Sequence, residues 1–217
     1  MITSKPLHKQ VSILGSTTHF WIYNPTKKPT IVMIHGFRGT HHGLQKIIDG
    51  LPDVRIIIPD LPGFGESSPM DQPATIRAYS QFVSQFIGQL KLGQPILLGH
   101  SFGSIVVADF VAHHPKAISK LILTNPIADN PVEGSRKLAT VAIRAYYWLG
   151  LHLPARLGLG LLRNRWIVLG SSKVMTKTTD QQLRAAIHAA HLQYFSSFAD
   201  RRLLYDVFQA SISSNVT

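Results

Sequence analysis

Residues 99–103 (GHSFG) constrain the fold of this chain more than any other stretch. They lie between two apolar runs, Pro95–Leu98 and Ser104–Ala112, which are typical of a buried strand and of a helix. A strand followed at once by a helix leaves the connecting turn almost no length, so the residue at its apex takes a strained backbone conformation. That residue is Ser101, and its side chain should project outward. The flanking glycines allow the strand and the helix to approach closely.

Two further motifs also follow strand-like apolar runs. The run Thr30–Ile34 ends in His35-Gly36-Phe37, and the run Arg55–Pro59 ends in a turn-rich segment, residues 60–67 (DLPGFGES). Uninterrupted apolar runs of this length are typical of strands that are covered on both faces. Further strands are predicted at residues 11–14 and 19–23, which form a hairpin, and at residues 117–124.

Helices are predicted between these strands and after them. The first covers residues 42–50, and the second covers residues 73–90, with a proline in its first turn and apolar residues recurring at three and four positions. Alternation of strand and helix predicts an α/β fold: a mostly parallel, doubly wound sheet entered through an antiparallel hairpin. Beyond Pro126 we expect helices at residues 135–149, 154–162 and 180–210, with a short strand at residues 166–169 as the one alternative element.

The charge of the chain is strongly positive but dispersed. The 217 residues carry a net charge of +11, and 45% of them are apolar, enough for a sizeable core. There is no nucleic-acid motif, so we expect no nucleic-acid partner. The most apolar stretch, residues 145–170, contains three arginines and a proline and does not predict a membrane span. Basic helices in the second half leave weak contact with an anionic membrane surface open.

The compartment is predicted from two absences in the sequence. There is no cysteine, which excludes disulfides and thiolate chemistry. Residues 1–10 lack the apolar core of a secretory signal, so we expect a cytoplasmic protein.

The order and spacing of the three motifs resemble the α/β-hydrolase superfamily, in its cofactor-free esterase, lipase and perhydrolase branch. The resemblance implies a hydrolase core at residues 1–126 and a helical cap at residues 127–217, inserted after the sixth strand. It further implies that Ser101 is the catalytic nucleophile and that the backbone N–H groups of Phe37 and Phe102 form the oxyanion hole. No cofactor and no metal are expected.

The chain departs from the family pattern where the acid and the base should follow. The family order is Ser, then Asp or Glu, then His, on loops after later strands, and no such strands are recognisable before Thr217. Asp129 is the one candidate acid, while His188 and His191 are expected on the surface of a cap helix. His35 and His100 are interpreted as supports of their loops, and Asp60 as a turn-forming carboxylate.

The missing base predicts a fragment or a degenerate paralogue that lacks the last core strands. Such a chain would leave a sheet edge exposed and be marginally stable alone.

Two functions from different classes therefore stand. The first is hydrolysis of an ester, thioester or amide of a small apolar acyl compound, with Ser101 as nucleophile. The alternative is a non-catalytic binding module that uses the hydrolase pocket and the basic cap to hold a ligand, an anionic membrane surface or a partner protein. A metal-dependent enzyme is disfavoured because the histidines show no ligand motif along the sequence, and the pairs at 41–42 and 113–114 are adjacent.

Overall fold

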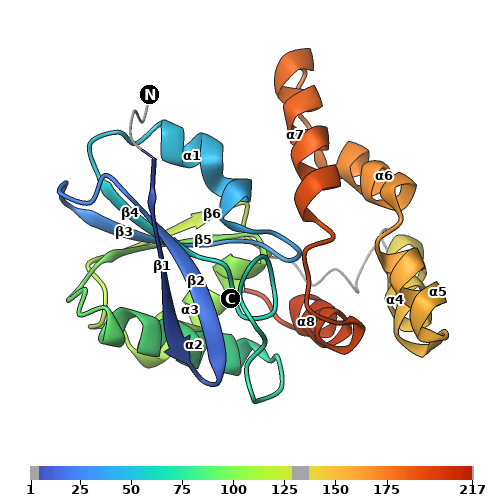
Figure 1. The fold of residues 1–217 in the computed structure, drawn as a ribbon, viewed down its shortest axis with the longest axis horizontal. Coiled ribbons are helices and arrows are strands. Elements are labelled where there is room, and N and C mark those ends of the chain that lie inside the picture. The colour runs from blue at the N-terminus through green and yellow to red at the C-terminus, as the bar shows by residue number, and fades with distance from the viewer. Residues whose placement is uncertain (1–4, 129–136, 217) are drawn as a thin grey trace.

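The computed structural model describes residues 5–128 and 137–216 (Figure 1). Its centre is a six-stranded sheet in the order β1-β2-β4-β3-β5-β6. The strands are β1 (Leu7–Ile13), β2 (Ser16–Tyr23), β3 (Thr30–Ile34), β4 (Arg55–Pro59), β5 (Ile96–His100) and β6 (Lys120–Thr124). β1 and β2 pair antiparallel, β2 joins β4 antiparallel, and the remaining pairs are parallel. The predicted fold class, a mostly parallel sheet entered through an antiparallel hairpin, is confirmed.

The hairpin is longer than predicted and turns one residue earlier. Ile13 pairs with Ser16, so the turn consists of Leu14 and Gly15, which have φ angles of 50° and 81°. Two successive residues with positive φ form the tight turn whose twist matches paired strands. The predicted hairpin is therefore present, but the prediction wrongly placed Leu14 in the first strand, since Leu14 lies in the turn.

Helices cover both faces of the sheet because the strands carry apolar side chains on both faces. A 3-10 turn, η1 (His41–Leu44), leads into α1 (Gln45–Asp49), which packs on one face with Met33 and Ile58. α2 (Ile76–Gln89) and α3 (Phe102–His113) cover the other face, and Figure 1 shows them opposite α1.

The start of α2 differs from the prediction. The side chain of Thr75 accepts a hydrogen bond from Ala78 N at 3.1 Å and caps the helix, so Pro73 lies before the helix rather than in its first turn.

Five helices follow the sheet in the described part of the chain. They are α4 (Lys137–His152), α5 (Ala155–Leu162), α6 (Arg165–Met175), α7 (Gln181–Tyr194) and α8 (Arg201–Ser213). The alternative strand at residues 166–169 is wrong, because Asn164 caps α6 by accepting from Trp166 N and Ile167 N. The single helix predicted over residues 180–210 is also wrong. It is two helices, and Asp200 begins the second by accepting from Leu203 N at 2.8 Å.

α8 packs into the apolar cluster on the side of the sheet that α2 and α3 cover. Leu204 and Val207 are fully buried in the same cluster as Val32 and Phe82. The predicted boundary between a core and a cap at residue 126 stays a prediction. However, α8, which follows this boundary, packs on the same side of the sheet as α2 and α3 (Figure 1).

Arg38 joins the sheet to the later helices. Its guanidinium is buried and donates to Leu162 O at 2.7 Å and to Phe195 O at 2.9 Å, carbonyls near the ends of α5 and α7. The guanidinium also lies over the ring of Phe198, with 5.6 Å between the guanidinium carbon and the ring centroid. A buried cation that satisfies carbonyls on two helices fixes those helices against the loop after β3.

Two observations concern the edges and surface of the described part of the chain. β6 ends the sheet order, so among the described residues it has a strand neighbour on one side only. None of the described helices is both long and apolar enough to span a bilayer. Whether the chain is marginally stable alone stays a prediction.

Candidate active site

Ser101 occupies the apex of a tight turn between β5 and α3. Its backbone has φ 53° and ψ −119°, a left-handed φ that non-glycine residues rarely adopt. Two hydrogen bonds maintain this strained conformation. Ser101 N donates to Thr124 O at 3.1 Å, and Ser104 N donates to Ser101 O at 2.8 Å. The predicted strand, turn and helix at this position are therefore present.

The two flanking glycines are required by contact with backbone. A Cβ on Gly99 would lie 2.5 Å from Gly103 O, and a Cβ on Gly103 would collide with Ile34 O and lie 2.7 Å from His35 O. No real Cβ makes such contacts, and these backbone atoms have no rotamer that would relieve them. The elbow thus depends on β5, α3 and the end of β3 meeting at van der Waals distance.

Two backbone amides lie in the segments that meet at the elbow. Phe102 N is in the first turn of α3, where an N–H has no intrahelical acceptor, and Phe37 N is in the loop after β3. Neither amide donates to another group among the described residues. The Phe37 ring is half-buried and packs edge-on against Tyr147, with 5.6 Å between centroids, while Phe102 is fully buried.

Ser101 faces a pocket of about 470 Å³ between the sheet loops and the later helices. Its walls are mainly apolar, but Thr40 contributes a buried hydroxyl that has no hydrogen-bond partner among the described residues. Lys177, in the connection between α6 and α7, adds a positive charge. A larger and more open depression of about 800 Å³ lies against α2, α3 and α8, and Ser101 does not line it.

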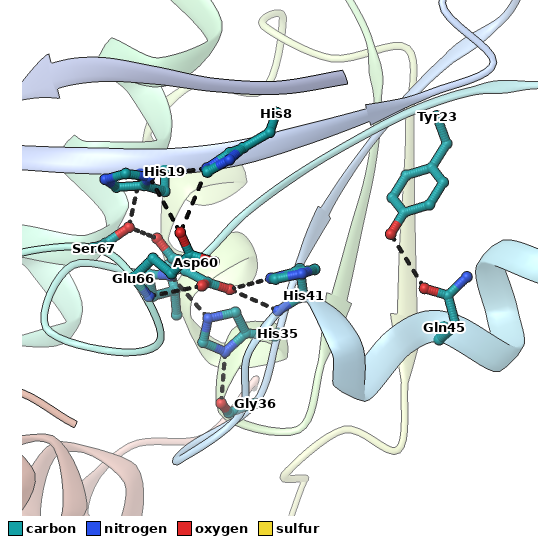
Figure 2. Close-up of polar contacts among 11 residues, drawn as sticks. His8, His19, Tyr23, His35, Gly36, His41, Gln45, Asp60, Glu66 and Ser67 are labelled. Atoms are coloured by element: carbon teal, nitrogen blue, oxygen red, sulfur yellow. Dashed lines mark hydrogen bonds and ion pairs between the residues drawn. The ribbon is translucent and has the colours of Figure 1, made fainter. Parts of the chain in front are cut away.

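Below the pocket, a buried hydrogen-bond network fixes the loops after β3 and β4 (Figure 2). His35 Nε2 accepts from Leu61 N at 2.8 Å, and its Nδ1–H donates to Gly36 O at 2.9 Å. Burial lowers the pKa of His35, which keeps the ring neutral and able to both accept and donate. His35 therefore supports its loop, and its two ring nitrogens are occupied by backbone groups.

Asp60 is the second member of this network. Its fully buried carboxylate accepts from His41 N at 2.7 Å, His41 Nδ1 at 3.0 Å and Glu66 N at 3.0 Å. Burial alone would raise the pKa of Asp60, but the hydrogen bonds from His41 and Glu66 N and the neighbouring His35 and His41 rings together outweigh burial and hold the pKa below its usual range. Asp60 is thus an ionised carboxylate that joins two turns by hydrogen bonds, and it does not face Ser101.

The later histidines are placed differently from the expectation. His188 and His191 were expected to decorate the surface, but both Nδ1 atoms lie within hydrogen-bond distance of the buried Ser172 Oγ, at 2.6 and 2.7 Å. His191 also lines the pocket of Ser101, and burial lowers its pKa to about 4. The i,i+3 spacing of the pair on α7 was visible in the sequence, whereas Ser172, its partner on α6, could not be identified without the fold.

The remaining candidates are not brought into contact with the serine hydroxyl. Among the described residues, Ser101 Oγ has no hydrogen-bond partner, and His100 and Asn125 line the same pocket without bonding to it. Asp129, the candidate acid, lies outside the described residues. The catalytic roles assigned to Ser101, Phe37 and Phe102 stay predictions.

The elbow geometry predicts opposite effects for two Gly→Ala substitutions. Gly103→Ala should destabilise the protein by about 3 kcal/mol or more, because the new methyl group overlaps fixed backbone. Gly88→Ala is the matched control: it is exposed in α2, nothing lies within 4 Å of its added Cβ, and it should stabilise by up to about 1 kcal/mol. Urea unfolding monitored by circular dichroism measures both. Equal effects of the two substitutions would contradict the close approach.

Comparisons with known proteins agree with this architecture. The family model described as "alpha/beta hydrolase fold" matches residues 29–151. Lipase LipV of Mycobacterium tuberculosis is 32% identical over 120 residues, which cover 54% of this chain and 44% of the lipase. Proline iminopeptidase of Lactobacillus helveticus is 30% identical over 127 residues, which cover 55% of this chain and 43% of the peptidase.

Solved structures share the fold at lower sequence identity. Epoxide hydrolase A of Mycobacterium thermoresistibile has a TM-score of 0.67 at 14% identity, covering 95% of this chain and 76% of that one. Epoxide hydrolase VrEH1 of Vigna radiata has a TM-score of 0.66 at 18% identity, covering 95% of this chain and 72% of that one. The chain spans less than half the length of the two curated relatives. The matched family model covers more than half of the chain, which therefore belongs to the alpha/beta hydrolase family.

Proposed function

We propose that Ser101 is the nucleophile of a hydrolase that cleaves an ester, thioester or amide of a small apolar acyl compound. The observation that supports this most is the strained backbone of Ser101, whose φ of 53° is maintained by contacts from three elements. Strained backbone at non-glycine residues clusters at active sites, where it can present a reactive side chain. Serine at this position suits acyl transfer because its oxygen can form and release an acyl ester.

The two free amides supply the second part of the proposed mechanism. When Ser101 Oγ attacks the acyl carbon, the carbonyl oxygen becomes an oxyanion that needs hydrogen-bond donors. Phe37 N and Phe102 N are donors without acceptors among the described residues, in the two segments that meet at the elbow. We assign the oxyanion to these two N–H groups.

The pocket supports an apolar acyl group as the substrate class. Its walls include aromatic and aliphatic side chains from the loop after β3, from η1, from the end of α6 and from α7 with the residue after it, namely Phe37, Leu44, Met175, Ile187 and Phe195. Burial of an acyl chain against such walls contributes about 0.8 kcal/mol for each methylene group. Lys177 and the unpartnered hydroxyl of Thr40 would contact a polar part of the same substrate.

The reaction also needs a general base, and no histidine is hydrogen-bonded to Ser101 within residues 5–128 and 137–216. The test uses the unaltered protein. A fluorophosphonate probe should label it once per chain, and Ser101→Ala should abolish labelling and lower kcat for aryl esters by on the order of 10⁴-fold or more.

Ser171→Ala is the control for this experiment. Ser171 is an exposed serine on α6 whose Oγ donates to Ile167 O, so its loss should leave labelling unchanged. Labelling that persists in Ser101→Ala, or its absence from the unaltered protein, would remove Ser101 as the nucleophile.

A second candidate is a binding module that contacts an anionic membrane surface through the later helices. α4, α5 and α6 expose large apolar side chains, including Trp166 at 72% and Leu157 at 62%. The sequence from Lys137 to Thr179 contains basic residues but no Asp or Glu. Exposed apolar side chains among uncompensated positive charges are typical of segments that lie on anionic lipid.

Liposome flotation tests this candidate. The protein should float with phosphatidylserine-containing vesicles at low salt and less at high salt, because exposed charges are screened. Trp166→Ala should weaken binding by roughly tenfold through lost apolar burial. Leu7→Ala, an exposed apolar residue of β1, should not weaken it. No flotation at low salt, or equal loss in both variants, would contradict membrane contact through these helices.

A further inference from the structure

Three potential metal ligands converge on the face of the β1–β2 hairpin, apart from the pocket of Ser101. They are His8 of β1, His19 of β2 and Glu66 of the loop after β4, and Figure 2 shows their side chains directed toward one another. His8 Nε2 lies 2.9 Å from His19 Nδ1. Glu66 Oε2 lies 3.7 Å from His8 Nε2 and 3.6 Å from His19 Nδ1. None of the three lines the pocket that contains Ser101.

The hairpin places the two histidines together. His8 pairs with Trp21 and His19 pairs with Gln10 in the antiparallel register, so the histidines are diagonal neighbours on one face of the sheet. The His8 ring stacks on Trp21, with 4.6 Å between centroids and 4° between planes. Trp21 is itself buried, so this contact restricts the orientation of the His8 imidazole.

The loop that carries Glu66 is fixed to the same strand. Ser67 Oγ accepts from His19 N at 2.9 Å and donates to Asp60 O at 2.8 Å. Glu66 N donates to the buried Asp60 carboxylate, as described above. The third ligand is thus held beside the first two by hydrogen bonds of the Glu66 backbone N–H and of the Ser67 hydroxyl.

The separations between ligand atoms suit a transition-metal ion. Tetrahedral coordination at bond lengths of about 2.0–2.2 Å separates neighbouring ligand atoms by about 3.3–3.6 Å. The observed separations of 3.6 and 3.7 Å lie at the upper end of this range and the separation of 2.9 Å lies below it, so side-chain shifts of a few tenths of an ångström would fit the ion. Two imidazole nitrogens and one carboxylate oxygen favour Zn²⁺ and similar ions over Mg²⁺ or Ca²⁺.

We propose that His8, His19 and Glu66 bind a divalent transition-metal ion, such as Zn²⁺, with solvent in the fourth position. All three side chains are partly exposed, which gives the ion access from solution. The ion would tether the hairpin to the loop at residues 60–67. That loop also bonds to the segment before α8, through Gly65 N to Ser197 O and Ala199 N to Gly63 O, both at 2.9 Å. The bound ion should therefore stabilise the junction between the sheet and the later helices.

Isothermal titration of the unaltered protein with Zn²⁺ tests the proposal, and thermal unfolding with and without Zn²⁺ is the second readout. We expect one ion per chain and a rise in Tm, since a ligand that binds only the folded state stabilises it. His19→Gln and Glu66→Gln should each weaken Zn²⁺ affinity by at least about tenfold and abolish the rise in Tm. Glu66→Gln changes a side chain that is more than half exposed, so it tests the site even where His19→Gln perturbs the hairpin.

His113→Gln is the matched control, because His113 is an exposed histidine near a carboxylate, 3.7 Å from Asp109. It should leave Zn²⁺ affinity and the rise in Tm unchanged. Absence of binding at millimolar Zn²⁺ would overturn the proposal, and the three side chains would then form only hydrogen bonds and ion pairs. Binding that keeps its affinity in both Glu66→Gln and His19→Gln would overturn it as well. Neither result depends on whether Ser101 is catalytic.

Discussion

The contact between Gly99, Gly103 and the end of β3 is the constraint on which the rest of the site depends. Without side chains at these two positions, α3 lies directly against the backbone of β5 and of residues 34 and 35. The chain between strand and helix is then so short that Ser101 must take a positive φ, and its side chain points into the pocket. The same approach brings the loop of Phe37 to the first turn of α3. One packing contact therefore positions the proposed nucleophile and both proposed oxyanion donors.

Two polar connections keep the surrounding loops in place. Asp60 joins the first residue of η1 to the loop after β4, and neutral His35 ties that same loop to Gly36 beside the elbow. Arg38 then joins the neighbouring residues to the ends of α5 and α7. Because each of these groups is buried, removal of one partner would leave a polar group unsatisfied, which costs far more than an exposed hydrogen bond contributes. The pocket walls are consequently supported from both the sheet and the later helices.

Local signals predicted the sheet well and the later helices less well. The strands from Thr30 onward are short apolar runs closed by glycine or proline, and their motifs fixed the position of the elbow within the fold. Asn164 and Asp200 act as helix caps, a signal that was present in the sequence but was outweighed by the apolar run after Asn164 and by the helical spacing of Tyr194, Phe198 and Phe208. Contacts between distant segments had no local signal. His8, His19 and Glu66 come from three segments, and Ser172 and the histidines of α7 come from two. Only strand register and helix packing show that the members of each group meet.

The structure of the protein after reaction with a fluorophosphonate would test the central claim most directly. Our account predicts a covalent bond between phosphorus and Ser101 Oγ, a positive φ at Ser101, and a phosphonyl oxygen at about 2.7–3.1 Å from both Phe37 N and Phe102 N. A phosphonyl oxygen turned toward solvent, with either amide bonded elsewhere, would contradict the assignment of the oxyanion hole. A helical φ at Ser101 would contradict the elbow itself.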